Sequence, residues 1–235
     1  MKNINILDNN TINKIAAGEV VERPSSVVKE LTENSIDANS TYITIEIKDG
    51  GTSLIRITDN GDGIPKDQVK TAFIRHATSK IQNIEDLESV ISLGFRGEAL
   101  PSIASVAQVE MQTKTSDEAT GTIIEINGEE LINQGDIGCA KGTSIVVRNL
   151  FYNVPARRKF LKKPATESGY ISDVINNLAL AHPEISFKYI NNDNVVLHTS
   201  GNNDLKTAIF HVYGKEVASK MLEVNYSKNS FKLTG

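Results

Sequence analysis

The sequence predicts an α+β fold, a two-layer sandwich in which helices cover a mixed, mostly antiparallel sheet. Two observations support this prediction. Segments that alternate between apolar and polar residues recur along the chain and are separated by turn residues, as expected for half-buried strands. Helical patterns gather early and late around a mostly antiparallel set of strands. A new helix-then-strand pattern after residue 203 predicts the start of a second α/β domain in residues 204–235.

The first helix is predicted to begin at Arg23-Pro24-Ser25, because proline is tolerated in a first helical turn. Glu30, Asn34 and Asp37 are spaced i, i+4 and i+7, so they fall on one narrow arc. We expect Glu33 on the same polar side. The adjoining arc is apolar and suited to pack on a sheet, with Val27, Val28, Leu31 and Ala38.

A hairpin is predicted next. Tyr42 to Lys48 alternates cleanly, Asp49-Gly50-Gly51 turns the chain, and Ser53 to Thr58 returns. Asp59 ends this strand and is followed by Gly61 and Gly63. A carboxylate there can accept a hydrogen bond from the exocyclic amine of adenine, and two residues without a Cβ would let a flat ring approach the backbone.

The aspartate motif has two alternative interpretations. A plain β-turn uses the same residue types and stays open on this motif alone. A calcium-binding EF-hand loop is excluded, because the twelfth position counted from Asp59 is Lys70 and not a glutamate.

The remaining elements follow from the same periodicities. Helices are expected at Lys66 to Ala72, Ile84 to Ile91, Gly97 to Ala104 and Thr166 to Ala181. Strands are expected at Ser105 to Thr113, Gly121 to Asn127 and Thr143 to Asn149.

A glycine-flanked loop, Gly94 to Leu100, leads into one of these helices. Exposed N–H groups at a helix start, with Arg96 nearby, suit a phosphate group. The ordinary P-loop is excluded, since no GxxxxGK[ST] string occurs. Thr78-Ser79-Lys80 and Gly142-Thr143 add hydroxyls and an ammonium that can complete a polar shell, although each also suits an ordinary loop or strand entry.

Composition limits the class of protein. The net charge of −4, from 25 basic and 29 acidic residues, argues against a uniformly DNA-coating surface but allows a local basic patch. One cysteine, Cys139, excludes an internal disulfide framework and fits a reducing compartment. Neither a signal-length apolar run nor the roughly 20 apolar residues of a membrane span is present, so we expect a cytoplasmic protein without a membrane partner.

Taken in order, four segments resemble the ATP-binding motifs of the gyrase, Hsp90, histidine kinase and MutL superfamily. They are Glu30 to Ala38, Asp59 to Gly63, Gly94 to Leu100, and Gly142-Thr143. Within that superfamily the chain is most similar to the MutL family of DNA mismatch repair proteins, and the similarity covers essentially the whole chain. The strings that distinguish it are Ile15 to Pro24, Arg75 to Lys80 and Phe151 to Leu161.

The resemblance implies a Bergerat-type ATP-binding domain in residues 1–203, followed by the beginning of a domain like the second domain of ribosomal protein S5. It also implies that ATP drives formation of a homodimer, with Met1 to Val20 crossing to the second subunit. The implied partners are MutS, a downstream nuclease or helicase, and DNA.

The resemblance also assigns roles. Glu30 would be the general base, Asn34 would offer its side-chain oxygen to Mg²⁺, and Asp59 would bind adenine, with Gly63 near the ring and Thr143 supporting the carboxylate directly or through water. Leu93 to Leu100 would close over the phosphates as a lid. The implied nucleotide site comprises Asn34, Asp37, Ala38, Asp59, Gly61, Gly63, Ile64, Thr78, Ser79, Lys80, Leu93, Gly94, Phe95, Arg96, Gly97, Glu98, Ala99, Leu100 and Thr143.

A basic run between Arg157 and Lys163 holds five cationic residues in seven. Contact with DNA phosphates would be independent of base sequence and sensitive to salt; a solvated charge run is the alternative. The cationic residues are Arg157, Arg158, Lys159, Lys162 and Lys163.

His76, beside Arg75, is interpreted as a packing or hydrogen-bonding group and not as a catalyst.

Two other function classes were compared with an ATPase. A histidine kinase or topoisomerase subunit on the same fold is disfavoured, because no phosphoacceptor-histidine helix precedes the ATP motifs. A binding module, in which nucleotide is only a structural ligand, differs by showing no turnover. The family's second-domain lysine lies beyond Gly235, so we expect weak hydrolysis by this chain alone; any endonuclease would also lie outside it.

Overall fold

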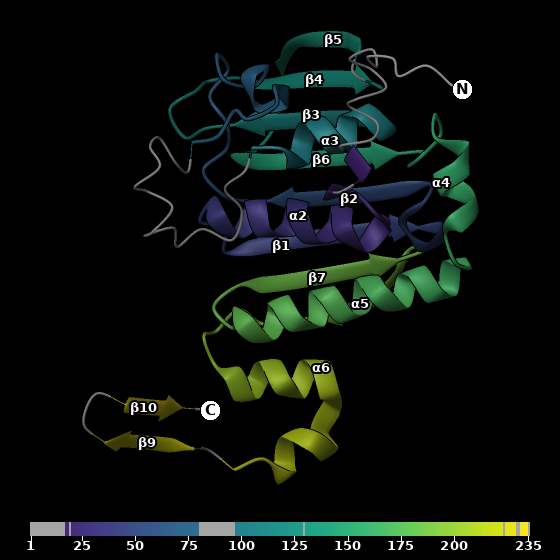
Figure 1. Ribbon diagram of the computed structural model, residues 1–235. Coiled ribbons are helices and arrows are strands. Elements are labelled where there is room, and N and C mark those ends of the chain that lie inside the picture. The colour runs from purple at the N-terminus through teal and green to yellow at the C-terminus, as the bar shows by residue number, and fades with distance from the viewer. Residues whose placement is uncertain are drawn as a thin grey trace.

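The computed structural model describes residues 17–18, 20–79, 97–128, 130–222, 224–228 and 231–234. An eight-stranded sheet in the order β5-β4-β3-β6-β2-β1-β7-β8 forms its centre (Figure 1). Neighbouring strands pair antiparallel, except β1 with β7, which pair parallel. The strands are β1 (Tyr42–Lys48), β2 (Leu54–Asp59), β3 (Gln108–Lys114), β4 (Gly121–Asn127), β5 (Glu130–Ile137), β6 (Gly142–Arg148), β7 (Ser186–Asn191) and β8 (Asn194–His198).

Helices cover one face of this sheet. In Figure 1, α2 lies in front of β1 and β2, α3 in front of β3 and β6, and α5 in front of β7. The helices are α2 (Pro24–Asp37), α3 (Ala99–Val106), α4 (Pro155–Phe160), α5 (Pro164–Ala181) and α6 (Leu205–Lys220), with short 3-10 turns η1 (Asp49–Gly51) and η2 (Thr71–Phe73). The predicted α+β architecture with a mixed, mostly antiparallel sheet is therefore confirmed.

The core lies between the sheet and its helices. Ile43, Ile45 and Ile47 alternate along β1 and are completely buried, and Val27 and Leu31 of α2 are buried in the same cluster. Each such side chain contributes roughly 1.5–3 kcal/mol on full burial. This apolar contact fixes α2 over the sheet and leaves its opposite side available for a site.

The ends of α2 follow from local sequence. Arg23 precedes the helix with an extended backbone, and Pro24 occupies the first turn. At the other end Ala38 N–H donates to the Asn34 carbonyl, and Asn39 turns the chain with a φ of 59°. The hairpin that follows is also as predicted, with Ile45 opposite Ile57.

Some predictions were wrong. Lys66 to Ala72 was expected to be a helix, but the chain makes turns that end in η2. Here the Lys66 N–H donates to Glu118 Oε1 at 2.9 Å, which ties the segment to the loop after β3. Strands β5, β7 and β8 were not predicted. The helix expected at Ile84 to Ile91 lies outside the described residues.

The part of the chain after residue 203 begins with α6, which contacts α5 and β8. Strands β9 (Asn225–Lys228) and β10 (Phe231–Thr234) then pair only with each other. Among the described helices, none combines the length and hydropathy needed to cross a membrane.

Candidate functional site

A cavity of about 790 Å³ lies where four separate parts of the chain meet. Its walls come from Val20 together with α2, the chain after β2, the start of α3 and the start of β6. Of the residues expected at the nucleotide site, those that line it are Glu30, Asn34, Asp37, Ala38, Gly63, Ile64, Thr78, Ser79, Gly97, Glu98, Ala99, Leu100 and Thr143. The expected residues Lys80, Leu93, Gly94, Phe95 and Arg96 lie outside the described part of the chain.

Helix α2 supplies the acidic wall of the cavity. Glu30, Asn34 and Asp37 all line it, as their i, i+4, i+7 spacing predicts. Glu33, which was expected on the same side, is buried, and its Oε2 lies 2.9 Å from Lys29 Nζ. Lys29 Nζ is 3.9 Å from Glu30 Oε1, so its closer ion pair is with Glu33.

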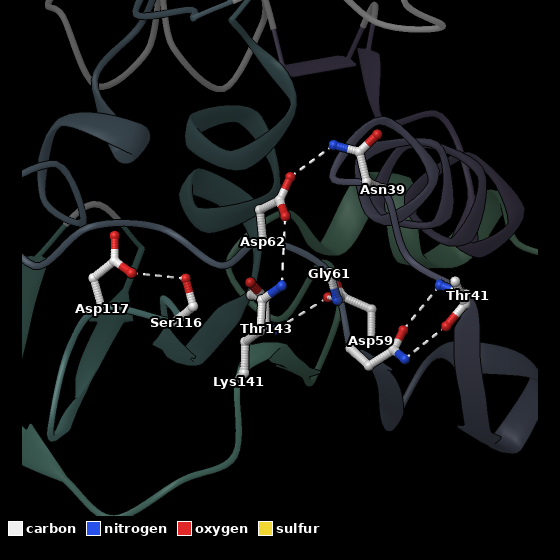
Figure 2. A network of polar contacts seen from close by, with 10 residues as sticks. Asn39, Thr41, Asp59, Gly61, Asp62, Ser116, Asp117, Lys141 and Thr143 are labelled. Atoms are coloured by element: carbon white, nitrogen blue, oxygen red, sulfur yellow. Dashed lines mark hydrogen bonds and ion pairs between the residues drawn. The ribbon is translucent and has the colours of Figure 1, made fainter.

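Asp59 is buried and accepts several hydrogen bonds. It is not among the described residues that line the cavity. Its Oδ1 accepts hydrogen bonds from the N–H groups of Gly61 (2.9 Å) and Thr143 (3.1 Å) (Figure 2). Its Oδ2 accepts the Ser35 hydroxyl at 2.7 Å. A carboxylate has about four lone-pair sites, and these donors occupy three of them.

The electrostatics of Asp59 reflect two opposing effects. Burial disfavours the charged form and raises the pKa of the carboxyl above its ordinary value of 3.8. The hydrogen bonds from Ser35, Gly61 and Thr143 stabilise the carboxylate and lower the pKa, but by less. Asp59 therefore takes up a proton more readily than an exposed aspartate.

Gly61 and Gly63 are also required by the packing of the backbone around them. A Cβ on Gly61 would lie 2.5 Å from the Ala38 carbonyl oxygen, and one on Gly63 would lie 2.2 Å from that of Lys114. Gly63 also has a φ of 77°, which favours glycine. The space that these glycines leave is thus filled by the protein's own backbone, at the end of α2 and at the end of β3.

Thr143 was expected to support the Asp59 carboxylate, and its N–H does so directly. Its hydroxyl instead lies 3.0 Å from the hydroxyl of Thr113, a residue that sequence reasoning missed. Thr113 is completely buried on β3 and accepts the Ile64 N–H at 2.8 Å. The only signal in the sequence is a threonine in the apolar row after Val109 and Met111.

Asp62 forms part of the rim and was also not predicted. Its carboxylate accepts a hydrogen bond from Asn39 Nδ2 at 2.7 Å and lies 3.6 Å from Lys141 Nζ (Figure 2). The Asn39 hydrogen bond, followed by the Lys141 charge, lowers the pKa of this exposed carboxyl. Asp62 also lines the cavity, so it adds a negative charge at the entrance.

Two segments that are distant in sequence meet beside α3. The His76 N–H donates to the Gly97 carbonyl at 3.1 Å, and His76 Nδ1 lies 3.2 Å from Glu98 Oε1. Gly97 has a φ of 61°, and a Cβ there would lie 2.4 Å from the Ala77 carbonyl oxygen. The structure thus places His76 as a hydrogen-bonding group that joins the residues flanking 80–96.

The basic run is not uniform. Arg157 Nη1 donates to the Val21 carbonyl at 3.3 Å, and its guanidinium occupies the space beside Gly18. Arg158, Lys159, Lys162 and Lys163 are exposed, and Phe160 among them is 84% exposed. Arg157 therefore faces the N-terminal segment, and the other four face solvent.

Comparison with known proteins is consistent with this geometry. The family model described as "Histidine kinase-, DNA gyrase B-, and HSP90-like ATPase" matches residues 22–150. DNA mismatch repair protein MutL of Agathobacter rectalis is 60% identical over 235 residues, which are 100% of this chain and 36% of that protein. MutL of Clostridium beijerinckii is 55% identical over 100% of this chain and 35% of its own length.

Solved structures that are similar to this chain also come from DNA repair proteins. The "Aquifex aeolicus MutL ATPase domain complexed with ADP" has a TM-score of 0.69 and 33% identity, over 88% of this chain and 73% of that one. The "N terminal domain of a DNA repair protein" has a TM-score of 0.74 and 29% identity, over 92% and 64%. The chain spans about a third of the length of the curated relatives it matches.

Proposed function

The chain belongs to the MutL family of DNA mismatch repair proteins and to the histidine kinase-, DNA gyrase B- and HSP90-like ATPases, and from that premise we propose that it binds and hydrolyses ATP in the cavity beside α2. The observation that carries this proposal is the convergence of four separate segments on one cavity, with acidic and amide side chains on one wall and the start of α3 on another. The similar Aquifex aeolicus domain complexed with ADP supports it.

Glu30 is the proposed general base. Hydrolysis needs a group that orients the attacking water and accepts its proton, and a carboxylate on the cavity wall meets this need. The Glu30 side chain is 31% exposed, so water reaches it. The N-terminal turn of α3, with Gly97 and Ala99 on the cavity surface, would face the phosphates through backbone N–H groups.

The residues present fit a bound Mg²⁺. This ion prefers oxygen ligands and keeps several waters, taking one or two protein groups besides substrate phosphates. The described residues contain no cluster of three or more His, Cys, Asp or Glu placed to hold a metal, whereas Asn34 offers a side-chain oxygen on the cavity wall. Bound there, Mg²⁺ would neutralise charge on the phosphate oxygens.

Asp59 and Thr143 are the proposed adenine-binding groups. The Thr143 N–H is bound to the Asp59 carboxylate and Thr143 lines the cavity, so the carboxylate and the Thr143 hydroxyl are the candidate acceptors on this side. Either oxygen can accept the exocyclic N–H of adenine, directly or through one water. Gly63 and Ile64 form the adjoining wall.

The family membership supports a wider role. We propose that ATP binding drives homodimer formation through residues 1–20, and that this switch links mismatch recognition by MutS to a downstream nuclease or helicase in the cytoplasm. Arg158, Lys159, Lys162 and Lys163 would contact DNA phosphates. Residues after 203 would begin a second domain, which is supported by the separate β9–β10 sheet. We propose that ATP hydrolysis by this chain is weak, as the resemblance to the family implies.

Calorimetric titration with a non-hydrolysable ATP analogue and Mg²⁺ tests the pocket. Saturable binding by the wild-type chain is expected, with loss in Asp59→Asn and retention in Asp173→Asn, an exposed aspartate on α5. A folded wild-type chain that shows no saturable binding, or an Asp59→Asn variant that binds normally, contradicts the assignment. Multiple turnover by a chain extended through the second domain would separate an ATPase from a module that holds nucleotide as a structural ligand.

A further inference from the structure

The Thr113 hydroxyl is the centre of a buried three-way contact. Its oxygen accepts the Ile64 N–H at 2.8 Å, lies 3.2 Å from the Gly142 carbonyl oxygen and lies 3.0 Å from the Thr143 hydroxyl. Thr113 itself is completely buried, so water does not compete for these partners. The polar groups in this cluster therefore depend on one another as hydrogen-bond partners.

The chemistry of these partners fixes the direction of each hydrogen bond. A backbone N–H only donates and a carbonyl oxygen only accepts, whereas a hydroxyl has one proton and two acceptor lone pairs. All three contacts are hydrogen bonds only if Thr113 donates its proton to Gly142 and accepts from both Ile64 and Thr143. The Thr143 proton then points inward to Thr113, and Thr143 presents only lone pairs elsewhere.

This direction matters because Thr143 lines the cavity and its N–H is bound to Asp59. An acceptor-only hydroxyl beside a carboxylate suits a ligand that donates. We propose that Thr113 is a positioning residue that fixes the polarity of Thr143, so that the site prefers a purine with an amino group at C6 over one with an oxo group there. The inference rests on the proposed nucleotide site and adds a specificity-determining residue to it.

The base preference separates this role from a merely structural one. Thr113 also holds Ile64, another residue of the cavity wall, so its loss would weaken every nucleotide to some degree. Only the polarity role predicts a change in the ratio between two bases. Without Thr113, the Thr143 hydroxyl is free to turn and donate to a 6-oxo group.

The test is calorimetric titration of wild type, Thr113→Val and Thr113→Ser with ADP and with IDP, whose bases differ at C6. Wild type is expected to prefer ADP. In Thr113→Val the ratio of ADP affinity to IDP affinity should fall about three- to tenfold, which corresponds to the loss of one hydrogen bond. In Thr113→Ser, which keeps the hydroxyl, this ratio should stay at the wild-type value. Equal weakening of ADP and IDP in Thr113→Val, or an unchanged ratio, overturns the inference.

Thr143→Val gives a second route if Thr113→Val does not fold. It should reduce the ADP preference on its own; where Thr113→Val does fold, adding it should reduce the preference no further, because both act through one hydroxyl. An unchanged ratio in Thr143→Val overturns the inference. If wild type binds neither nucleotide, the proposed function fails with it, whereas ADP binding with an unaltered ratio rejects the Thr113 role alone.

Discussion

The hydroxyl of Ser35 lies 2.7 Å from Oδ2 of Asp59, which joins the buried side of α2 to the end of β2. Another side of the same helix carries Glu30 and Asn34 on the cavity wall. This hydrogen bond therefore links the helix that carries the proposed catalytic wall to the proposed adenine-binding carboxylate. Because both partners are buried, this contact is protected from water.

Ser35→Ala should destabilise the protein and weaken nucleotide binding. It removes a donor to a buried carboxylate, and hydrogen bonds to charged groups are worth about 1.5–3 kcal/mol. Ser102→Ala is a matched control, since Ser102 is also a buried helix serine, but its hydroxyl has no partner among the described residues. Denaturant unfolding of both variants checks this; equal losses of stability would contradict the role of Ser35.

Nucleotide affinity should depend on pH through Asp59. The adenine N–H binds more strongly to the charged carboxylate than to the neutral acid, and the pKa of Asp59 is raised by burial. Affinity is therefore expected to fall with decreasing pH from a point above 3.8, the ordinary aspartate value. Titrations from neutral to acidic pH measure this; an affinity that holds constant until the protein unfolds would exclude the assignment.

The same shift predicts an effect of opposite sign on stability. A carboxyl whose folded-state pKa exceeds its unfolded value contributes most below 3.8 and loses that contribution as pH rises through the folded pKa. The free energy of unfolding of wild type relative to Asp59→Asn should therefore decrease with rising pH over this window. A difference that increases with pH would indicate a depressed pKa instead.

Gly63→Ala should be strongly destabilising for a reason unrelated to ligand. The new Cβ would lie 2.2 Å from the Lys114 carbonyl oxygen, at a φ of 77°. Strain of this kind costs about 1–3 kcal/mol, and the backbone clash adds to it. Gly138→Ala, where a Cβ would meet no atom within 4 Å, is the control and should be neutral or slightly stabilising. Thermal unfolding midpoints compare the two, and similar midpoints would reject this account of Gly63.

Arg157 and Arg158 should separate two functions of the basic run. Arg157→Gln removes the hydrogen bond to the carbonyl of Val21, which is the neighbour of the cavity residue Val20. Loss of one hydrogen bond costs about 1 kcal/mol, so nucleotide affinity should fall about fivefold. Arg158→Gln should instead lower DNA affinity and the salt dependence of binding, because an exposed cation releases counterions when it meets phosphate. Calorimetry and DNA-binding anisotropy at two salt concentrations check both; the reverse pattern would refute the assignment.

Strong periodicity explains which elements could be predicted. Strands β1 and β4 match their predicted bounds, and α5 begins two residues earlier than expected. The segment from Lys66 to Ala72 could not be read correctly, since a hydrogen bond to Glu118, a residue distant in sequence, holds it. Strands β7 and β8 are short and separated by only two residues, so the asparagine-rich turn dominated that part of the sequence.

In the functional site, too, features set by local spacing could be predicted, whereas contacts between distant residues could not. The helical spacing of Glu30, Asn34 and Asp37 predicted a shared wall, because neighbours on one arc depend only on local geometry. Ser35 and Thr113 were missed, since a single polar residue in an apolar row gives no indication of its partner. Arg157 could not be distinguished from the neighbouring basic residues in the sequence, because its contact with Val21 joins residues far apart in the chain.

The most direct test compares ATP turnover with ATP binding for Glu30→Ala in a chain extended through the second domain. Glu130→Ala, an exposed glutamate on β5, serves as the control. If Glu30 is the general base, turnover should fall by about 10²- to 10⁴-fold while the affinity for a non-hydrolysable analogue stays close to wild type. Turnover that persists in Glu30→Ala, or binding that is lost in proportion to turnover, would contradict the account.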